Sequence, residues 1–156
     1  YTARHNDDTT SPRPRKSIFA HVSHQQGRCI GVSTKDIQVL VQGRMQQAKE
    51  SLDDGFFLRE ANRSNRTIVN RTYYAAFYAA LALLQTINFT PRKHSGVLSF
   101  FDKEFVRTGL FGKEHSKSFH RLFQLRQKDD YDLIDTVPDE EADEALQLSQ
   151  SFNRCN

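Results

Sequence analysis

Two arginines, each close to tyrosines, are the residues of this chain best suited to hold an anion. Arg71 opens the segment Arg-Thr-Tyr-Tyr-Ala-Ala-Phe-Tyr, and Arg126 stands in Leu-Arg-Gln-Lys-Asp-Asp-Tyr. A guanidinium is always charged, and its planar fork matches a phosphate group with two parallel hydrogen bonds. One interpretation of the two segments is therefore a cleft that binds phosphate, with Arg71, Tyr78 and Arg126 among its residues.

The first of these segments has the composition of a packing helix. Arg71, Tyr74 and Tyr78 fall at positions i, i+3 and i+7, so they share one helix face. Alanines dominate the residues that follow. We expect a neighbouring helix to approach closely there, with a polar, aromatic seam along the helix.

Arg126 admits two interpretations. The apolar spacing of its helix turns the guanidinium toward the packed side, where an unpaired charge is costly. Asp130 at i+4 can supply a carboxylate and Tyr131 follows it, which would make a structural ion pair at a helix end. Alternatively, Arg126 is presented to a phosphate together with Arg71 and Tyr78.

His94 is the third candidate, because it stands at a predicted helix start beside basic residues. It either contacts an anion, or caps the turn and fills a polar gap between helices. The other histidines do not have the spacing of a metal site, since His115 and His120 lie on different helix faces. We expect neither a metal nor another cofactor, and the sequence has no nucleophile elbow or phosphate-binding glycine loop.

Five helices must position these residues. The apolar spacing and the stop signals predict them over residues 34–59, 65–84, 95–107 and 113–128, with the last beginning after Pro138. No segment alternates as a strand would. The sequence thus predicts an all-α bundle of four main helices plus a short C-terminal one.

Length and composition set the outer limits. A chain of 156 residues makes one folded unit. We expect residues 1–35, which have no sustained period, to be a flexible leader or tail and residues 36–156 to form the helical domain. Without a long apolar run or a signal-peptide pattern, the chain is expected to be soluble and cytoplasmic.

The net charge of +3 is unevenly distributed. The middle of the chain is basic, whereas residues 127–156 carry far more acidic than basic side chains. Either the basic body offers a surface to nucleic acid, or the acidic tail folds back over the body and neutralises it. Both interpretations stay open at this stage.

Several motifs together resemble the HEPN domain family. They are Arg71-Thr-Tyr-Tyr-Ala-Ala-Phe-Tyr, Lys93-His-Ser-Gly-Val97, Phe105-Val-Arg-Thr-Gly109, and Leu125-Arg126 with Asp130-Tyr131. The resemblance implies an up-and-down bundle that forms a homodimer. It also implies a prokaryotic toxin–antitoxin or defence system, often with a minimal nucleotidyltransferase as partner.

Many HEPN proteins are metal-independent endoribonucleases that use an arginine followed, after four to six residues, by a histidine. In this chain the corresponding positions hold Tyr78 after Arg71 and Tyr131 after Arg126. A tyrosine, with an ordinary pKa of about 10, moves protons poorly near neutrality. We therefore expect a protein that binds RNA, a nucleotide or a partner protein. The alternative is an endoribonuclease with a diverged motif, in which His94 or His120 is brought near an arginine.

Overall fold

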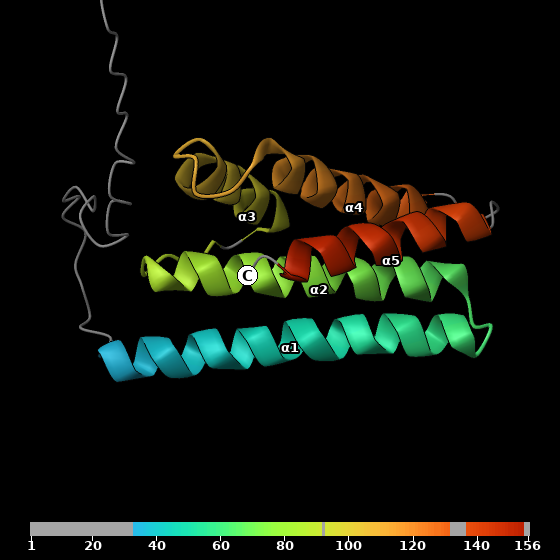
Figure 1. Ribbon diagram of the computed structural model, residues 1–156, viewed down its shortest axis with the longest axis horizontal. Coiled ribbons are helices and arrows are strands. Elements are labelled where there is room, and N and C mark those ends of the chain that lie inside the picture. Colours follow the sequence, from blue (N-terminus) through green and yellow to red (C-terminus); the bar gives the residue numbers. More distant parts are fainter. Residues whose placement is uncertain (1–32, 92, 132–136, 155–156) are drawn as a thin grey trace, which may run out of the picture.

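The computed structural model describes residues 33–91, 93–131 and 137–154, with side chains in the second range described up to Lys128. These ranges are helical and contain no strand, which confirms the all-α class (Figure 1). The elements are α1 (Thr34–Glu60), α2 (Asn65–Thr86), α3 (His94–Phe101), a π-helical segment η1 (Asp102–Val106), α4 (Lys113–Tyr131) and α5 (Asp139–Arg154). Most of the predicted leader lies outside the described residues. Its last residues, Ser33–Lys35, form the cap and first turn of α1.

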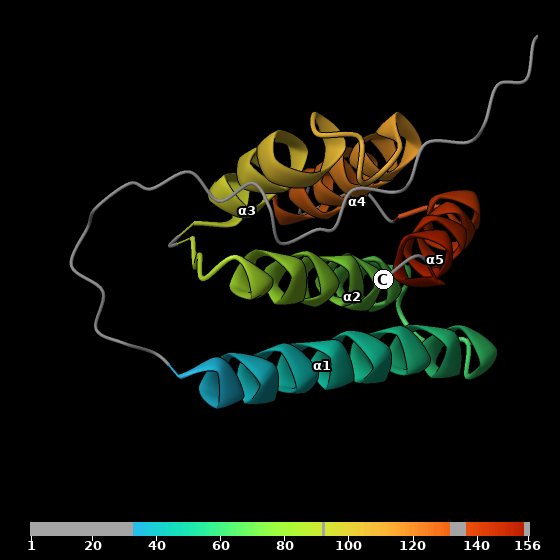
Figure 2. The same cartoon turned by 60° about the vertical axis from the view of Figure 1, so that its left-hand side comes forward.

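Helix α1 begins directly after Ser33, which caps it. The Ser33 side chain accepts a hydrogen bond from the Lys35 backbone N–H, and the Asp36 carboxylate accepts one from the Ser33 backbone N–H. This capping box satisfies two N–H groups that the helix leaves without partners. α1 then runs beside α2 (Figures 1 and 2) and buries only a narrow strip of small residues, Ala48, Ser51 and Gly55.

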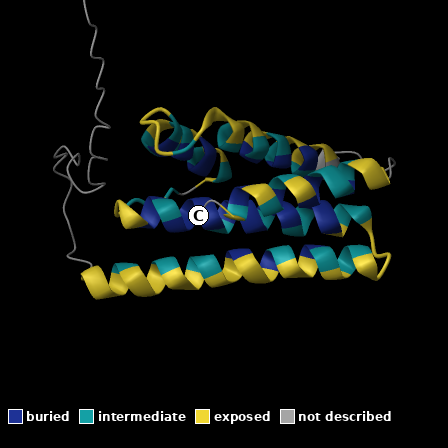
Figure 3. Cartoon of the chain, in the orientation of Figure 1, coloured by how far each residue is buried: buried dark blue, intermediate teal, exposed yellow. Residues whose placement is uncertain are grey.

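Helix α2 lies at the centre of the bundle. α1 lies on one side of it and α3 with α4 on the other, and α5 packs against a third side (Figure 2). Its alanines are fully buried (Figure 3): Ala75, Ala76, Ala79, Ala80 and Ala82. Small side chains let neighbouring backbones come close. The burial of these alanines is consistent with the predicted close approach of a neighbouring helix.

Aromatic rings fix the positions of α3, α4 and α5 relative to one another. The rings of Phe101, Phe119 and Phe152 come from these three helices and are all buried. Their centroids lie between 5.3 and 5.9 Å apart, Phe119 meeting Phe101 edge to face. Each fully buried phenylalanine contributes about 1.5–3 kcal/mol, so this cluster holds α3 and α4 in register above α2.

Two predicted helices differ from the structure. The one predicted over residues 95–107 has α geometry to Phe101 and π geometry from Asp102 to Val106. The spacing of apolar residues hardly distinguishes an α-helix from a single π-helical turn, because that one wider turn leaves the same residues facing the core. The C-terminal helix is not the short one, since α5 has 16 residues and α3 has 8.

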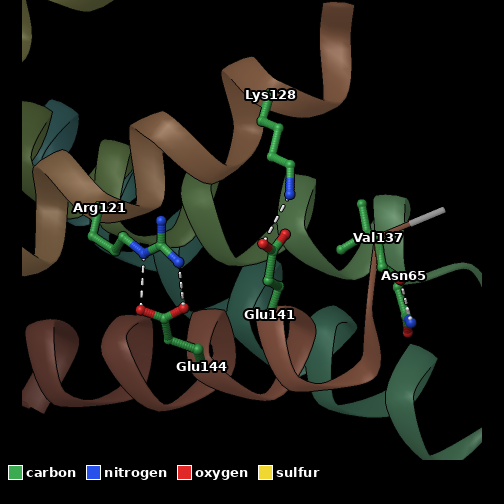
Figure 4. Close-up of polar contacts among 6 residues, drawn as sticks. All are labelled: Asn65, Arg121, Lys128, Val137, Glu141 and Glu144. Atoms are coloured by element: carbon green, nitrogen blue, oxygen red, sulfur yellow. Dashed lines mark hydrogen bonds and ion pairs between the residues drawn. The ribbon is translucent and has the colours of Figure 1, made fainter. Parts of the chain in front are cut away.

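The acidic tail does fold back over the basic body. Arg121 of α4 donates two hydrogen bonds to Glu144 of α5, at 2.9 and 2.8 Å, and Lys128 Nζ lies 2.9 Å from Glu141 Oε1 (Figure 4). Asn65 at the start of α2 donates to the Val137 carbonyl at 2.9 Å. Charge neutralisation by α5 therefore occurs along this side of the bundle.

The same side has a second ion-pair group at the end of α1. Arg59 Nε lies 2.7 Å from Asp143 Oδ1, and Arg59 Nη1 lies 3.3 Å from Asp139 Oδ1. Nearby hydrogen bonds from Asn65 and Arg59 lower the pKa of the Asp139 carboxyl. These contacts hold α5 against the end of α1. Because the Arg59 charge is already paired there, we expect a site for an external anion elsewhere on the bundle. Within the described part of the chain, no helix is long and apolar enough to cross a membrane.

Candidate functional site

The Arg126 guanidinium lies over two tyrosine rings of α2. Its Cζ atom is 5.1 Å from the Tyr73 ring centroid and 5.4 Å from that of Tyr74. The positive charge meets the negative face of each ring, a contact worth about 0.5–2 kcal/mol. Tyr73 is fully buried, whereas Tyr74 and Arg126 are partly exposed. The side chains of Asp130 and Tyr131 lie outside the described residues, so the predicted pairing of Arg126 with Asp130 stays a prediction.

His94 reaches the same place from the first residue of α3. Its ring stacks on Phe77 at a centroid distance of 4.4 Å and meets Tyr74 edge to face at 5.9 Å. Its Nδ1 atom is 3.0 Å from the Tyr73 hydroxyl. His94 thus fills a polar gap between α2 and α3, one of the two interpretations of its sequence position. The same packing leaves it partly exposed beside Arg126.

The environment of Tyr73 determines which nitrogen of His94 carries the proton. A buried phenol must donate its own hydrogen, and His94 Nδ1, 3.0 Å from the Tyr73 hydroxyl, is an acceptor within reach. We therefore assign the tautomer by this hydrogen-bond argument. Neutral His94 then carries its hydrogen on Nε2 and offers an N–H group.

The pKa shifts point the same way. Burial lowers the pKa of His94, and the charge of Arg126 lowers it further by opposing a second positive charge. Burial raises the pKa of Tyr73, although Arg126 acts in the opposite direction. At neutral pH the histidine and the phenol are both uncharged, and Arg126 supplies the charge of the site.

Tyr78 extends the aromatic surface by one helical turn. Its ring centroid is 5.7 Å from that of Tyr74, and Arg44 of α1 places its Cζ atom 5.7 Å from the Tyr78 centroid. We call Tyr73, Tyr74, Tyr78, His94 and Arg126 the arginine–tyrosine cluster. The structure brings together four of the residues proposed from sequence, namely Tyr74, Tyr78, His94 and Arg126.

Arg71 has a different neighbour. Its Nη1 atom lies 3.7 Å from Asp54 Oδ2 of α1, and both side chains are well exposed. It shares the helix face of Tyr74 and Tyr78, as the spacing predicts, but its contact is directed toward α1. The predicted pairing of Arg71 with Arg126 in one cleft therefore has no support from the contacts of Arg71.

The second histidine proposed as a substitute lies elsewhere. His120 Nε2 is 2.7 Å from Asp102 Oδ2 of η1, on the outer side of α3 and α4. Of these two histidines, His94 is the one that folding brings to Arg126. In the described part of the chain, no three His, Cys, Asp or Glu side chains gather as they would around a metal ion.

Sequence reasoning did not select Tyr73 or Arg44. A signal existed for Tyr73, because tyrosine at a buried position implies a partner for its hydroxyl. Arg44 has no such signal, since its position over Tyr78 depends on how α1 and α2 align.

The model of the HEPN domain matches residues 41–155, which include the whole arginine–tyrosine cluster. The chain belongs to the HEPN family. Similar HEPN relatives cover most of its length. A UPF0332 protein of Thermotoga maritima is 38% identical over 106 residues, which are 68% of this chain and 80% of the relative. A protein of Methanocaldococcus jannaschii named "Putative toxin MJ0605" is 36% identical over 118 residues, covering 76% of this chain and 87% of the relative.

A second Methanocaldococcus jannaschii protein, named "Putative toxin MJ0142", is 39% identical over 84 residues, or 54% of this chain and 57% of the relative. Within this HEPN chain, the histidine beside Arg126 arrives from α3 and not from the helix that carries the arginine. The site thus combines an arginine and a histidine without the spacing that the HEPN nuclease motif requires.

Proposed function

We propose that this HEPN protein is a component of a toxin–antitoxin-type system and binds single-stranded RNA or a nucleotide at the arginine–tyrosine cluster. The observation that carries the proposal is the partly exposed Arg126 guanidinium held over Tyr73 and Tyr74, with the His94 ring beside it. The names of the two archaeal relatives support the toxin–antitoxin setting.

Four members of the cluster have distinct parts in binding. The Arg126 guanidinium donates to a phosphate oxygen, and such charge-assisted hydrogen bonds are about twice as strong as neutral ones. The partly exposed Tyr74 ring accepts a base by stacking, which contributes about 1–3 kcal/mol per base. The His94 Nε2–H adds a neutral donor. Tyr73 contacts Arg126 and His94 and holds both in place.

A second function, metal-independent RNA cleavage, is favoured by one observation. Cleavage without a metal needs a group that moves protons near neutrality, and His94 stands beside Arg126. A general base, however, needs a free lone pair, whereas the hydrogen bond from Tyr73 leaves a hydrogen on His94 Nε2. Binding is therefore the function that we put first.

The partner proteins are proposed on the family resemblance. We propose a homodimer and a minimal nucleotidyltransferase partner, in the cytoplasm. The outer side of α1 supports a protein contact, because Val39 and Phe57 are 67% and 68% exposed. They are five helical turns apart and so lie on one line along α1.

One experiment separates binding from cleavage. A fluorescent single-stranded RNA and a mixed RNA pool are incubated in EDTA with wild type, Arg126→Ala, His94→Gln and Arg71→Ala. Lys117→Ala, which removes an exposed charge from the same helix as Arg126, is the matched control. Circular dichroism checks that each variant stays helical.

We expect Arg126→Ala to weaken RNA binding about 10- to 150-fold, from the loss of a charged hydrogen bond worth about 1.5–3 kcal/mol. Arg71→Ala should have a smaller effect, because Asp54 already pairs with Arg71. Equal weakening by Arg126→Ala and Lys117→Ala would contradict the proposed site. Cleavage by wild type that His94→Gln abolishes would establish the second function.

A further inference from the structure

Four side chains form a continuous row across the surface of α2. Arg126 of α4 lies over Tyr74, the Tyr74 ring lies next to that of Tyr78, and Arg44 of α1 lies over Tyr78. The Arg126 Cζ atom is 5.4 Å from the Tyr74 ring centroid, and the Arg44 Cζ atom is 5.7 Å from that of Tyr78. The two tyrosine ring centroids are 5.7 Å apart. A guanidinium therefore stands at each end of a pair of tyrosine rings. We call these four residues the two-arginine row.

The row lies on a side of α2 that α5 does not cover. Helix α5 reaches α2 at Thr72, whose carbonyl accepts a hydrogen bond from buried Ser149 at 2.8 Å. Thr72 points about 160° away from Tyr74, from the ~100° turn per residue of an α-helix. α1 lies on one side of α2 and α3 with α4 on the other (Figure 2). All four residues of the row are partly exposed.

The charge of Arg44 is available to a ligand. Its Nη1 atom donates to Gln47 Oε1 at 2.8 Å, a neutral amide that leaves the positive charge in place. The acidic residues Asp143, Glu141 and Glu144 of α5 already pair with Arg59, Lys128 and Arg121 on another side of the bundle. The row thus has the charge of Arg44 at one end and the partly exposed Arg126 guanidinium at the other.

The spacing of the row exceeds what a single nucleotide can fill. Tyr74 and Tyr78 are separated by one helical turn, about 6 Å along the axis. A mononucleotide has one base, whereas a single strand can place successive splayed bases on successive aromatic rings and its phosphates on basic side chains. Two rings flanked by two arginines match that repeating pattern.

We infer that the ligand is a single-stranded oligonucleotide occupying at least two nucleotide positions, one at Arg126 and Tyr74 and the next at Tyr78 and Arg44. The inference rests on the proposed function and deepens it by naming the length of the ligand. It assigns to Arg44, outside the arginine–tyrosine cluster, the phosphate of the second position.

The test compares ligands of different length. Binding of uridine monophosphate and of a 5′-phosphorylated tetrauridylate is measured by calorimetry and by competition, between 50 and 300 mM salt. The variants are Arg44→Ala, Arg126→Ala, Tyr78→Ala and Tyr78→Phe. Lys49→Ala removes an exposed charge from α1 and is the matched control for Arg44→Ala.

We expect the wild type to bind the tetranucleotide more tightly than the mononucleotide, and Arg44→Ala to remove most of that gain without affecting the mononucleotide. For the tetranucleotide, Arg44→Ala should also lower the slope of log affinity against log salt by about 0.7, the value for one phosphate contact with a single strand. Tyr78→Ala should weaken tetranucleotide binding about 5- to 150-fold, and Tyr78→Phe should preserve it.

Equal effects of Arg44→Ala and Lys49→Ala on the tetranucleotide would overturn the second position, as would an equal loss of both ligands in Arg44→Ala. If the mononucleotide binds too weakly to measure, the salt dependence of tetranucleotide binding is compared between Arg44→Ala and Lys49→Ala. A lower slope in Arg44→Ala alone would support the second position, and equal slopes would overturn it. If Tyr78→Ala changes the molar mass measured by light scattering but leaves nucleotide binding intact, the row is a protein interface and the inference is wrong. Binding that depends on Arg126 alone refutes only this inference, whereas no binding of either ligand by wild type refutes the proposed function.

Discussion

The substitution Tyr73→Phe removes the hydrogen bond between Tyr73 and His94 by deleting one oxygen atom. The substitution keeps the buried ring and its contacts with Phe77, Phe119 and Phe123. It deletes the hydroxyl that lies 3.0 Å from His94 Nδ1. Any change in stability or in the pKa of His94 then reports on the loss of this hydroxyl.

The expected loss of stability is small and measurable. A typical hydrogen bond contributes about 0.5–1.5 kcal/mol, and the partly exposed His94 can recruit water to Nδ1, so we expect about 1 kcal/mol. For a domain of this size that corresponds to a fall in Tm of about 3–6 °C. Tyr73→Ala is the contrast, since truncating a buried aromatic side chain costs about 3–5 kcal/mol.

The titration of His94 gives an independent readout. If Tyr73 donates to Nδ1, the bond stabilises the neutral ring, and removing it raises the pKa of His94. If Nδ1–H donates to the phenol instead, the bond favours the charged ring and its removal lowers the pKa. Nitrogen-15 NMR of the imidazole measures both the pKa and the tautomer, with His94→Gln identifying the signal.

The pH dependence of stability follows from the same shift. The pKa of folded His94 lies below its unfolded value of about 6.5, so the unfolded state binds more protons between the two values. Stability therefore falls as pH drops through that interval, and Tyr73→Phe should make the fall smaller. An unchanged unfolding free energy together with a lowered His94 pKa would refute the tautomer and the reasoning behind the binding role.

Two further predictions concern packing and charge. A Cβ atom on Gly55 would lie 3.3 Å from both Leu146 Cδ2 and Thr72 Cγ2, whereas one on Gly43 meets nothing within 4 Å. In chemical denaturation, Gly55→Val should therefore lose about 1–3 kcal/mol and Gly43→Ala should gain up to about 1 kcal/mol, and equal effects at the two sites would contradict the fit of α1 on α2 and α5. The hydrogen bonds from Arg121 lower the pKa of Glu144, so this pair stabilises the fold above the ordinary glutamate pKa of about 4.3, and its contribution is lost as pH falls through the lower folded value. Acid titration of Glu144→Gln, followed by circular dichroism, should show a weaker loss of stability in that range than wild type, and an identical acid profile would exclude the contribution.

Several features of this protein follow from sequence alone because they depend on neighbours along the chain. Helix positions come from apolar spacing, from the Ser33 cap and from the breaks near Gly109 and Pro138, all of which act within one or two turns. The shared face of Tyr74 and Tyr78 is likewise local, since four residues always make about one turn. The family resemblance has the same basis, because its motifs are short runs of residues.

Tertiary packing alone decides which side chains meet across helices. Arg71 and Arg126 look alike in sequence, yet Asp54 of α1 pairs with one, whereas the rings of Tyr73 and Tyr74 face the other. His94 reaches Tyr73 only because the buried phenylalanines hold α3 over α2. Such contacts depend on the alignment and rotation of each helix against its neighbours, which many side chains set together and no local spacing encodes.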